Sequence, residues 1–155
     1  EDIFESFERR IARPIGMEDF SRKDGRYVLD PSSKHPAYPF YMSARDLARF
    51  GLLFQNGGRW GNRQIVPARW VEESTAAHSQ TDRKGRGYGY LWWVLDANMW
   101  GAGAALASGH GGQLVAIIPA KRIVMVQTIA AGPMSGRPRT RDFLTLLRKV
   151  MDAAP

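Results

Sequence analysis

The fold of this chain is decided by residues 114–129, which read LVAIIPAKRIVMVQTI. The apolar, β-branched runs 114–118 and 123–129 are typical of buried strands. The short connection Pro119-Ala120-Lys121-Arg122 fits a tight turn, so we predict an antiparallel hairpin. The aromatic run 88–94 predicts a third strand. Both outer strands of this sheet would be open edges unless another segment pairs with them.

Two helices are predicted in the first half of the chain, where apolar residues recur at helical spacing. The first covers residues 3–13 and stops before a proline. The second starts after the N-cap Ser43, with Asp46 as the carboxylate of a capping box, and ends at the glycine pair 57–58. Between them, residues 18–37 lack periodicity and predict a long loop, of the kind that often borders an active site.

Two further helices are predicted towards the C-terminus. A short helix from Pro67 to about Thr75 is expected to bury Trp70 and Val71. The last helix starts at Thr140, and its apolar stripe is expected to lie on one face of the sheet. That stripe consists of Phe143, Leu144, Leu147, Val150 and Met151. The whole pattern predicts an α+β fold in which helices pack on an antiparallel sheet.

Length and composition favour a single domain. The 155 residues support one modest hydrophobic core. Residues 1–80 are expected to hold helices and loops, and residues 86–155 three strands and the C-terminal helix. No membrane span is predicted, because no apolar run approaches the ~20 residues that cross a bilayer. The chain begins with Glu1 and lacks a leader pattern, so we expect a processed chain or a fragment.

Metals, cofactors and nucleic acid are not expected. There is no cysteine, and His35, His78 and His110 lie far apart without a ligand spacing. The formal net charge is +7, but the basic residues cluster at turns of the second half instead of forming one stripe. A solvated surface is the first interpretation, and attraction of an anionic substrate or envelope is the second. A nucleic-acid-binding domain, whose affinity would fall steeply with salt, is the third.

The run 107–113, Ala-Ser-Gly-His-Gly-Gly-Gln, is a candidate functional site. Small residues before a buried strand suit a place where a ligand approaches the backbone closely. Gly111 and Gly112 leave room for a substrate along the strand edge, and the backbone N–H of Gln113 could then point at a developing oxyanion. The alternative is a glycine-rich hairpin loop with a solvated His110.

Five segments of the sequence carry a family resemblance. They are RPIGMED (13–19), SARDLARFG (43–51), QIVPARWV (64–71), YGYLWW (88–93) and GHGGQ (109–113). In this order and at this approximate spacing they resemble the C-terminal half of the serine β-lactamase-related hydrolases. That family includes class C β-lactamases, D-alanyl-D-alanine carboxypeptidases, esterases and 6-aminohexanoate-dimer hydrolases.

The resemblance implies the C-terminal portion of a β-lactamase/transpeptidase-like fold and hydrolysis of a small amide or ester through an acyl-serine. His-Gly-Gly at 110–112 matches the family motif, often Lys-Thr-Gly, that lines the cleft. By that resemblance His110 orients substrate or tunes a proton relay, and the Gln113 N–H forms half of the oxyanion hole. The substrate-binding candidates are Gly111 and Gly112 of this motif, Tyr41 and Trp92. Tyr41 belongs to the segment 38–41, which could wall the acyl pocket or pack in the core, and Trp92 could border the cleft or pack in the core, since side chains alternate along a strand.

Two family motifs have no counterpart at the expected place. Ser-x-x-Lys, which supplies nucleophile and base, is absent because no serine is followed three residues later by lysine. Tyr-x-Asn is absent too, and Tyr41-Met42-Ser43 is a formal Tyr-x-Ser match at a helix start, away from the family's position. We therefore expect a segment that lacks its nucleophile and is inactive alone. Its expected partner is the missing N-terminal part of the same domain.

The rival interpretation is a penicillin-binding-like module that binds a ligand or a protein without catalysis. An upstream region without Ser-x-x-Lys would favour it. The sequence does not separate a β-lactam, a peptidoglycan peptide, an ester and a short linear amide as substrates. Family habit favours a periplasmic or secreted bacterial protein, and a cytoplasmic location stays open.

Overall fold

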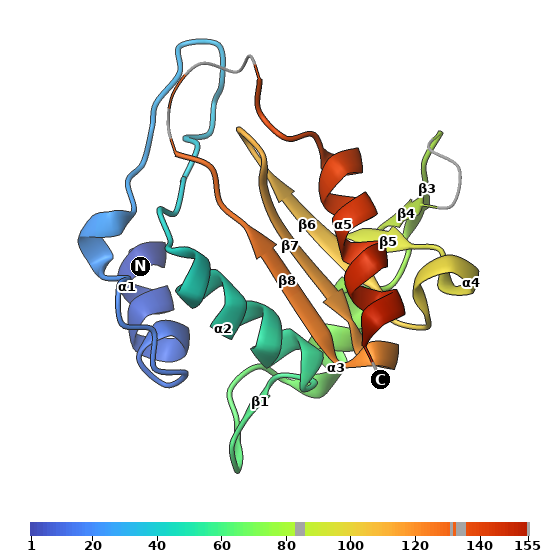
Figure 1. The fold of residues 1–155 in the computed structure, drawn as a ribbon. Coiled ribbons are helices and arrows are strands. Elements are labelled where there is room, and N and C mark those ends of the chain that lie inside the picture. The colour runs from blue at the N-terminus through green and yellow to red at the C-terminus, as the bar shows by residue number, and fades with distance from the viewer. Residues whose placement is uncertain (83–85, 131, 133–135, 155) are drawn as a thin grey trace.

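One antiparallel sheet forms the centre of the described chain, which comprises all residues except 83–85, 131, 133–135 and 155 (Figure 1). In this computed structural model the strand order follows the chain, and each strand pairs antiparallel with the next. The six strands of the sheet are β3 (Ser79–Gln80), β4 (Arg86–Tyr88), β5 (Trp93–Leu95), β6 (Ala105–Gly109), β7 (Gln113–Ile118) and β8 (Ile123–Gln127).

The hairpin predicted from residues 114–129 is confirmed. β7 and β8 are paired from Ile118↔Ile123 to Leu114↔Gln127. Their connection is a 3₁₀ turn, Pro119–Lys121, that ends in a left-handed residue. Proline suits the first position of such a turn, because its φ is already set and its missing N–H has no partner to lose there.

The sheet is larger than the sequence predicted, with six strands where three were expected. β6 was missed because its small residues carry little strand propensity, yet it pairs with both β5 and β7. β3 was missed because it has only two residues, both polar and exposed, and it extends the sheet into the part expected to hold only helices and loops. The predicted strand 88–94 is divided into β4 and β5, because Leu91 has a φ of 65°.

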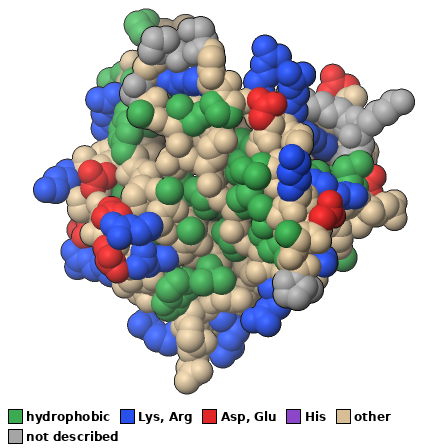
Figure 2. All heavy atoms as spheres, viewed as in Figure 1, with side chains coloured by type: hydrophobic (Ala, Val, Ile, Leu, Met, Phe, Trp, Pro, Cys, Tyr) green, Lys and Arg blue, Asp and Glu red, His purple; other side chains and the backbone are tan. Residues whose placement is uncertain are grey.

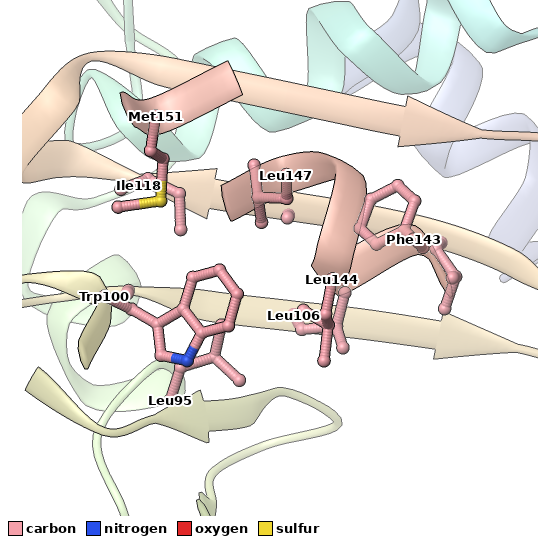
Figure 3. Close-up of a cluster of buried hydrophobic side chains, with 11 residues drawn as sticks. Leu95, Trp100, Leu106, Ile118, Phe143, Leu144, Leu147 and Met151 are labelled. Atoms are coloured by element: carbon pink, nitrogen blue, oxygen red, sulfur yellow. The ribbon is translucent and has the colours of Figure 1, made fainter. Parts of the chain in front are cut away.

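The helix α5 (Thr140–Ala153) covers one face of the sheet, as the sequence predicted (Figure 1). Figure 3 shows its apolar side chains directed at the strands, where Leu106 and Ile118 lie beneath them. The buried residues of α5 are Phe143, Leu144, Leu147 and Met151. Val150 is 39% exposed, so its predicted burial is wrong. Each fully buried Leu or Phe contributes about 1.5–3 kcal/mol to folding.

The helix α2 (Ala44–Gln55) packs on the opposite face of the sheet. Ala105 and Ile117 lie in the core on this side, while their neighbours Leu106 and Ala116 lie under α5, as the two-residue period of a strand requires. Gly51 allows the close approach: a Cβ there would lie 2.6 Å from Cγ1 of Val124. The predicted N-cap is confirmed, since the Asp46 N–H donates to the Ser43 hydroxyl at 3.1 Å.

Shorter elements surround this sandwich. They are α1 (Ile3–Phe7), a π-helix (Glu8–Ala12), a 3₁₀ turn (Arg22–Asp24), β1 (Arg59–Trp60), β2 (Arg63–Gln64), α3 (Ala68–Ser74) and α4 (Ala97–Trp100). α1 and the π-helix together confirm the helix predicted over 3–13. Trp70 is 48% exposed while Val71 is buried, so the predicted burial of Trp70 is wrong; a short surface helix buries only one of its faces. No helix in the described ranges combines the length and the apolar character that a bilayer crossing needs.

β8 is the outer strand on one side of the described sheet, and β3 is the outer strand on the other. The five residues of β8 are all half-buried, whereas β7 beside it is buried from Leu114 onward. Figure 2 shows hydrophobic side chains gathered over β8, between α2 and α5. Among the described residues no strand pairs with the outer side of β8, as the sequence predicted. The second predicted open edge, at residues 88–94, is wrong, because β4 and β5 are each paired on both sides.

Candidate functional site

The run 109–113 forms the tip of the β6–β7 hairpin. Gly109 pairs with Gln113 at the ends of the two strands, and residues 110–112 make the turn. Gly111 and Gly112 have φ of 77° and 91°, where glycine alone is unstrained. A Cβ at Gly111 would lie 2.8 Å from a guanidinium nitrogen of Arg137, and one at Gly112 would lie 2.8 Å from Cδ1 of Ile129. The positive φ values thus favour glycine at these positions, and a side chain there would also displace the ends of Arg137 and Ile129.

The side-chain amide of Gln113 pairs with the backbone of Ile129. Its Nε2 donates to the Ile129 carbonyl at 2.9 Å, and its Oε1 accepts from the Ile129 N–H at 2.9 Å. Ile129 lies two residues beyond the end of β8. The amide therefore continues the contact between these two segments past their last paired residues, Leu114 and Gln127.

Two further side chains bind the carbonyls of the turn. Gln127 Nε2 donates to the Gly112 carbonyl at 3.0 Å. Arg137 Nη1 donates to the Gly111 carbonyl at 3.0 Å, and its other terminal nitrogen donates to the Ala130 carbonyl at 3.2 Å. Sequence reasoning missed Gln127 and Arg137, because both lie far from the glycines in sequence and only the folded hairpin brings them together.

The structure brings together four of the predicted site residues and separates two. His110, Gly111, Gly112 and Gln113 share the turn, where the side chain of His110 is exposed and that of Gln113 is half-buried. The predicted alternative, a glycine-rich hairpin loop, describes the same geometry. The catalytic roles of His110 and Gln113 stay predictions.

Trp92 and Tyr41 lie in other surroundings. The Trp92 side chain is 5% exposed and packs on Phe54 with ring centroids 5.1 Å apart, in the core beneath α2. It offers almost no surface to a ligand in this structure. Tyr41 is 54% exposed, with the Arg26 guanidinium 5.5 Å from its ring centre, and its N–H donates to the Asp24 carbonyl at 2.8 Å. Its contacts are thus within the long loop that precedes α2.

A buried carboxylate, assigned from the sequence only to a capping box, anchors this loop. Asp46 is 0% exposed and accepts backbone N–H bonds from Glu18 (3.1 Å), Asp19 (3.1 Å) and Phe20 (2.9 Å). The capping box predicted for Asp46 is therefore wrong, because its side chain reaches across to the loop instead of back to Ser43. The only sequence clue was an acidic residue in the first turn of an otherwise apolar-faced helix.

A polar network extends around this anchor. The Ser43 hydroxyl, and after it the Arg45 guanidinium, hold the pKa of the Asp19 carboxyl below its ordinary value. Arg49 pairs with Glu18 at 2.7 Å and lies 3.6 Å from Asp46. The start of α2 and the loop are thus joined by charged groups as well as by backbone bonds.

Two other features of the surface bear on the site. Within the described ranges, no three His, Cys, Asp or Glu side chains form a group that could hold a metal ion. A cleft of about 410 Å³ lies between α1, the π-helix and the segment 65–70, and no residue of the 110–113 turn lines it. The glycine turn is therefore a candidate site because of its glycine conformations and not because of a ready-made cavity; Gly111 is buried, and Gly112 and Gln113 are half-buried.

Comparisons with known proteins show which family and which solved structures the chain resembles. The family model described as Beta-lactamase matches residues 1–147. A protein from Bacillus anthracis whose assignment as a 6-aminohexanoate-dimer hydrolase is provisional superposes with a TM-score of 0.67 and 23% identity. An octameric penicillin-binding protein homologue from Pyrococcus abyssi superposes with a TM-score of 0.63 and 20% identity. These pairings cover 97% and 96% of this chain but 39% and 37% of those two chains. No curated protein matches.

Proposed function

Because the chain belongs to the β-lactamase family, we propose that it forms part of a serine hydrolase that cleaves a small-molecule amide or ester through an acyl-serine intermediate. The observation that carries this proposal is the glycine turn at 110–112. Its two glycines have positive φ values, at which any other residue is strained. Such a turn lets a flat acyl group approach the peptide backbone closely.

In this proposal the turn supplies one wall of the cleft. The Gln113 N–H donates to the oxyanion of the tetrahedral intermediate, and a single donor of this kind contributes about 10²–10³ in kcat. His110, exposed beside it, orients the substrate or tunes proton transfer. Gly111 and Gly112 provide the surface along which the substrate lies.

The nucleophile comes from outside these 155 residues in this proposal. Ser-x-x-Lys does not occur in the sequence, and the chain spans 39% of the length of the Bacillus anthracis protein. We therefore expect the isolated chain to show no turnover, since the turn alone retains only positioning and polarisation.

The open edge of β8 supports the same division of the site. In the part of the chain that the structure describes, no strand pairs with β8 on the side away from β7, and apolar side chains surround it (Figure 2). An uncovered apolar edge favours pairing with another segment. We propose that polypeptide carrying the nucleophile completes the sheet at β8.

Covalent labelling tests the proposal. A fluorophosphonate probe is applied to the 155-residue chain and, separately, to the full-length natural polypeptide that contains it (the longer polypeptide). The adduct is mapped by mass spectrometry. We expect an adduct, formed as serine oxygen displaces fluoride from phosphorus, on an upstream Ser-x-x-Lys serine of the longer polypeptide alone. Heat-denatured samples of both serve as controls.

Two outcomes contradict it. An adduct on a serine of the 155-residue chain would place the nucleophile within the chain. No adduct on a folded longer polypeptide would favour the rival function, a penicillin-binding-like module that binds without catalysis.

A further inference from the structure

The two glycines of the turn carry no side chain whose packing could fix its conformation. Glycine loses more backbone freedom on folding than any other residue, and the His110 side chain is exposed. A hydrogen-bond donor for a developing charge is effective only when its direction is set before reaction. The order of the turn must therefore come from side chains elsewhere in the fold.

The carbonyl bonds of the turn set the directions of its N–H groups. A trans peptide is planar, so its carbonyl and the N–H of the next residue point in opposite directions. Gln127 holds the Gly112 carbonyl at 3.0 Å, which directs the Gln113 N–H away from Gln127. Arg137 holds the Gly111 carbonyl at 3.0 Å, which directs the Gly112 N–H in the same manner.

The paired amide of Gln113 adds a third constraint. Its two bonds to Ile129, both 2.9 Å, involve one donor and one acceptor. They therefore fix the orientation of the amide as well as its distance from the Ile129 backbone. Gln113 is thereby held on both sides: its side chain by Ile129, and the peptide that carries its N–H by Gln127. Ile129 also lies beside the turn, since a Cβ at Gly112 would be 2.8 Å from its Cδ1.

We propose that Gln127 and Arg137 are positioning residues, which together with the Gln113 side chain fix the directions of the peptide N–H groups of the turn. The catalytic consequence rests on the proposed function; the orientation itself does not. Neither residue touches the substrate, and each acts through one carbonyl of the turn.

The first test measures the orientation in the 155-residue chain. Gln127→Met removes the donor at nearly constant size, and Gln127→Lys restores a donor. Gln64→Met is the matched control, because Gln64 also donates from its amide to backbone carbonyls, of Gly57 at 2.7 Å and of Val66, away from the turn. ¹⁵N relaxation reports the order of the Gly112 and Gln113 amides.

We expect the order parameters of both amides to fall from about 0.85 to below about 0.6 in Gln127→Met. Gln127→Lys should recover most of that loss, and Gln64→Met should leave the turn unchanged. Unchanged amides in Gln127→Met would overturn the proposal whatever the activity of the protein. Equal disorder in Gln64→Met would also overturn it, because the effect would then be general destabilisation.

The second test measures catalysis in the longer polypeptide. An interaction made only in the transition state changes kcat and leaves KM nearly constant. We expect Gln127→Met and Arg137→Lys to lower kcat about 10–100-fold with KM within about twofold. A rise in KM at constant kcat would overturn the catalytic role. If Gln127→Met disorders the Gly112 and Gln113 amides but the folded longer polypeptide takes no fluorophosphonate, the proposed function is refuted and the positioning role stands.

Discussion

The β6–β7 hairpin is held in two different ways along its length. At the end away from its tip, Leu106 and Ile118 are 0% exposed and lie beneath Leu147 and its neighbours on α5 (Figure 3). At its tip, the glycines are held by hydrogen bonds from Gln127 and Arg137. Apolar burial depends on area and carries little direction, whereas a hydrogen bond depends steeply on angle.

The comparison separates what stabilises the fold from what shapes the site. A residue under α5 contributes several kcal/mol but tolerates small shifts of its neighbours. A residue at the tip contributes about 0.5–1.5 kcal/mol net, yet it determines where a peptide N–H points. Substitutions in the two regions should therefore differ in kind, and the following predictions test that difference.

The largest effect is expected under α5. Leu147→Ala removes a side chain that is 0% exposed in the core cluster, and such a truncation costs about 2–5 kcal/mol through lost burial and the cavity left behind. Chemical denaturation measures the free energy of unfolding. Leu146→Ala, on the solvent side of the same helix at 55% exposure, is the control and should stay within about 0.5 kcal/mol. Equal losses would mean that α5 does not pack as described.

A buried polar anchor should come second. Asp46→Ala leaves the N–H groups of Glu18, Asp19 and Phe20 without their acceptor. Each unsatisfied buried donor costs about 1–3 kcal/mol, so we expect a total near 3 kcal/mol after partial rehydration. Faster proteolysis within residues 18–42 should accompany it.

Asp152→Ala is the matched control for Asp46. Its carboxylate is 71% exposed and pairs only loosely with Arg148 at 3.8 Å, and such surface pairs contribute about 0–1 kcal/mol. If both aspartates cost the same, the backbone bonds of Asp46 do not stabilise the loop.

The elements that sequence predicted correctly are those with strong local patterns. The β7–β8 hairpin, α2 and α5 all carry a clear hydrophobic period and match the predictions. β6 and β3 carry no such pattern. They pair with the neighbouring strands β5, β7 and β4, but their small or polar residues carry too little strand propensity to reveal it.

For the candidate site, the sequence located the turn but not what holds it. The glycines and His110 stand out because small residues precede a buried strand. Gln127 and Arg137 look like ordinary polar positions near a strand end and a basic cluster. Their role depends on distances of 3.0 Å to carbonyls of residues far away in sequence, and only the three-dimensional structure supplies these.

Gly111→Ala should reveal the tip as a determinant of geometry. The alanine is strained at a φ of 77°, which costs about 1–2 kcal/mol. Its Cβ also displaces the Arg137 guanidinium, whose end is flexible, from the Gly111 carbonyl. Gly16→Ala is the control, with a φ of 69° and open space around its Cβ position. We expect similar losses in unfolding free energy, but shifted and broadened amide resonances of Gly112 and Gln113 in Gly111→Ala alone. Identical spectra would show that Arg137 does not order the turn.

The smallest effect on stability is expected at Glu8, where the pH dependence of the urea midpoint distinguishes a charged contact from apolar burial. A hydrogen bond from Arg13, and after it one from the Arg22 N–H, lowers the pKa of the Glu8 carboxyl below its ordinary value of 4.5. A lowered pKa stabilises the folded state fully above the unfolded value, and that stabilisation is lost as the pH falls through the folded pKa. Glu8→Gln should therefore lower the urea midpoint at pH 7, with the difference from the unmodified chain vanishing at strongly acidic pH. Leu147→Ala should lower the midpoint at both pH values, because apolar burial does not titrate. If the difference between Glu8→Gln and the unmodified chain persists unchanged in acid, packing of the Glu8 side chain, and not its charge, stabilises its contact with Arg13 and Arg22.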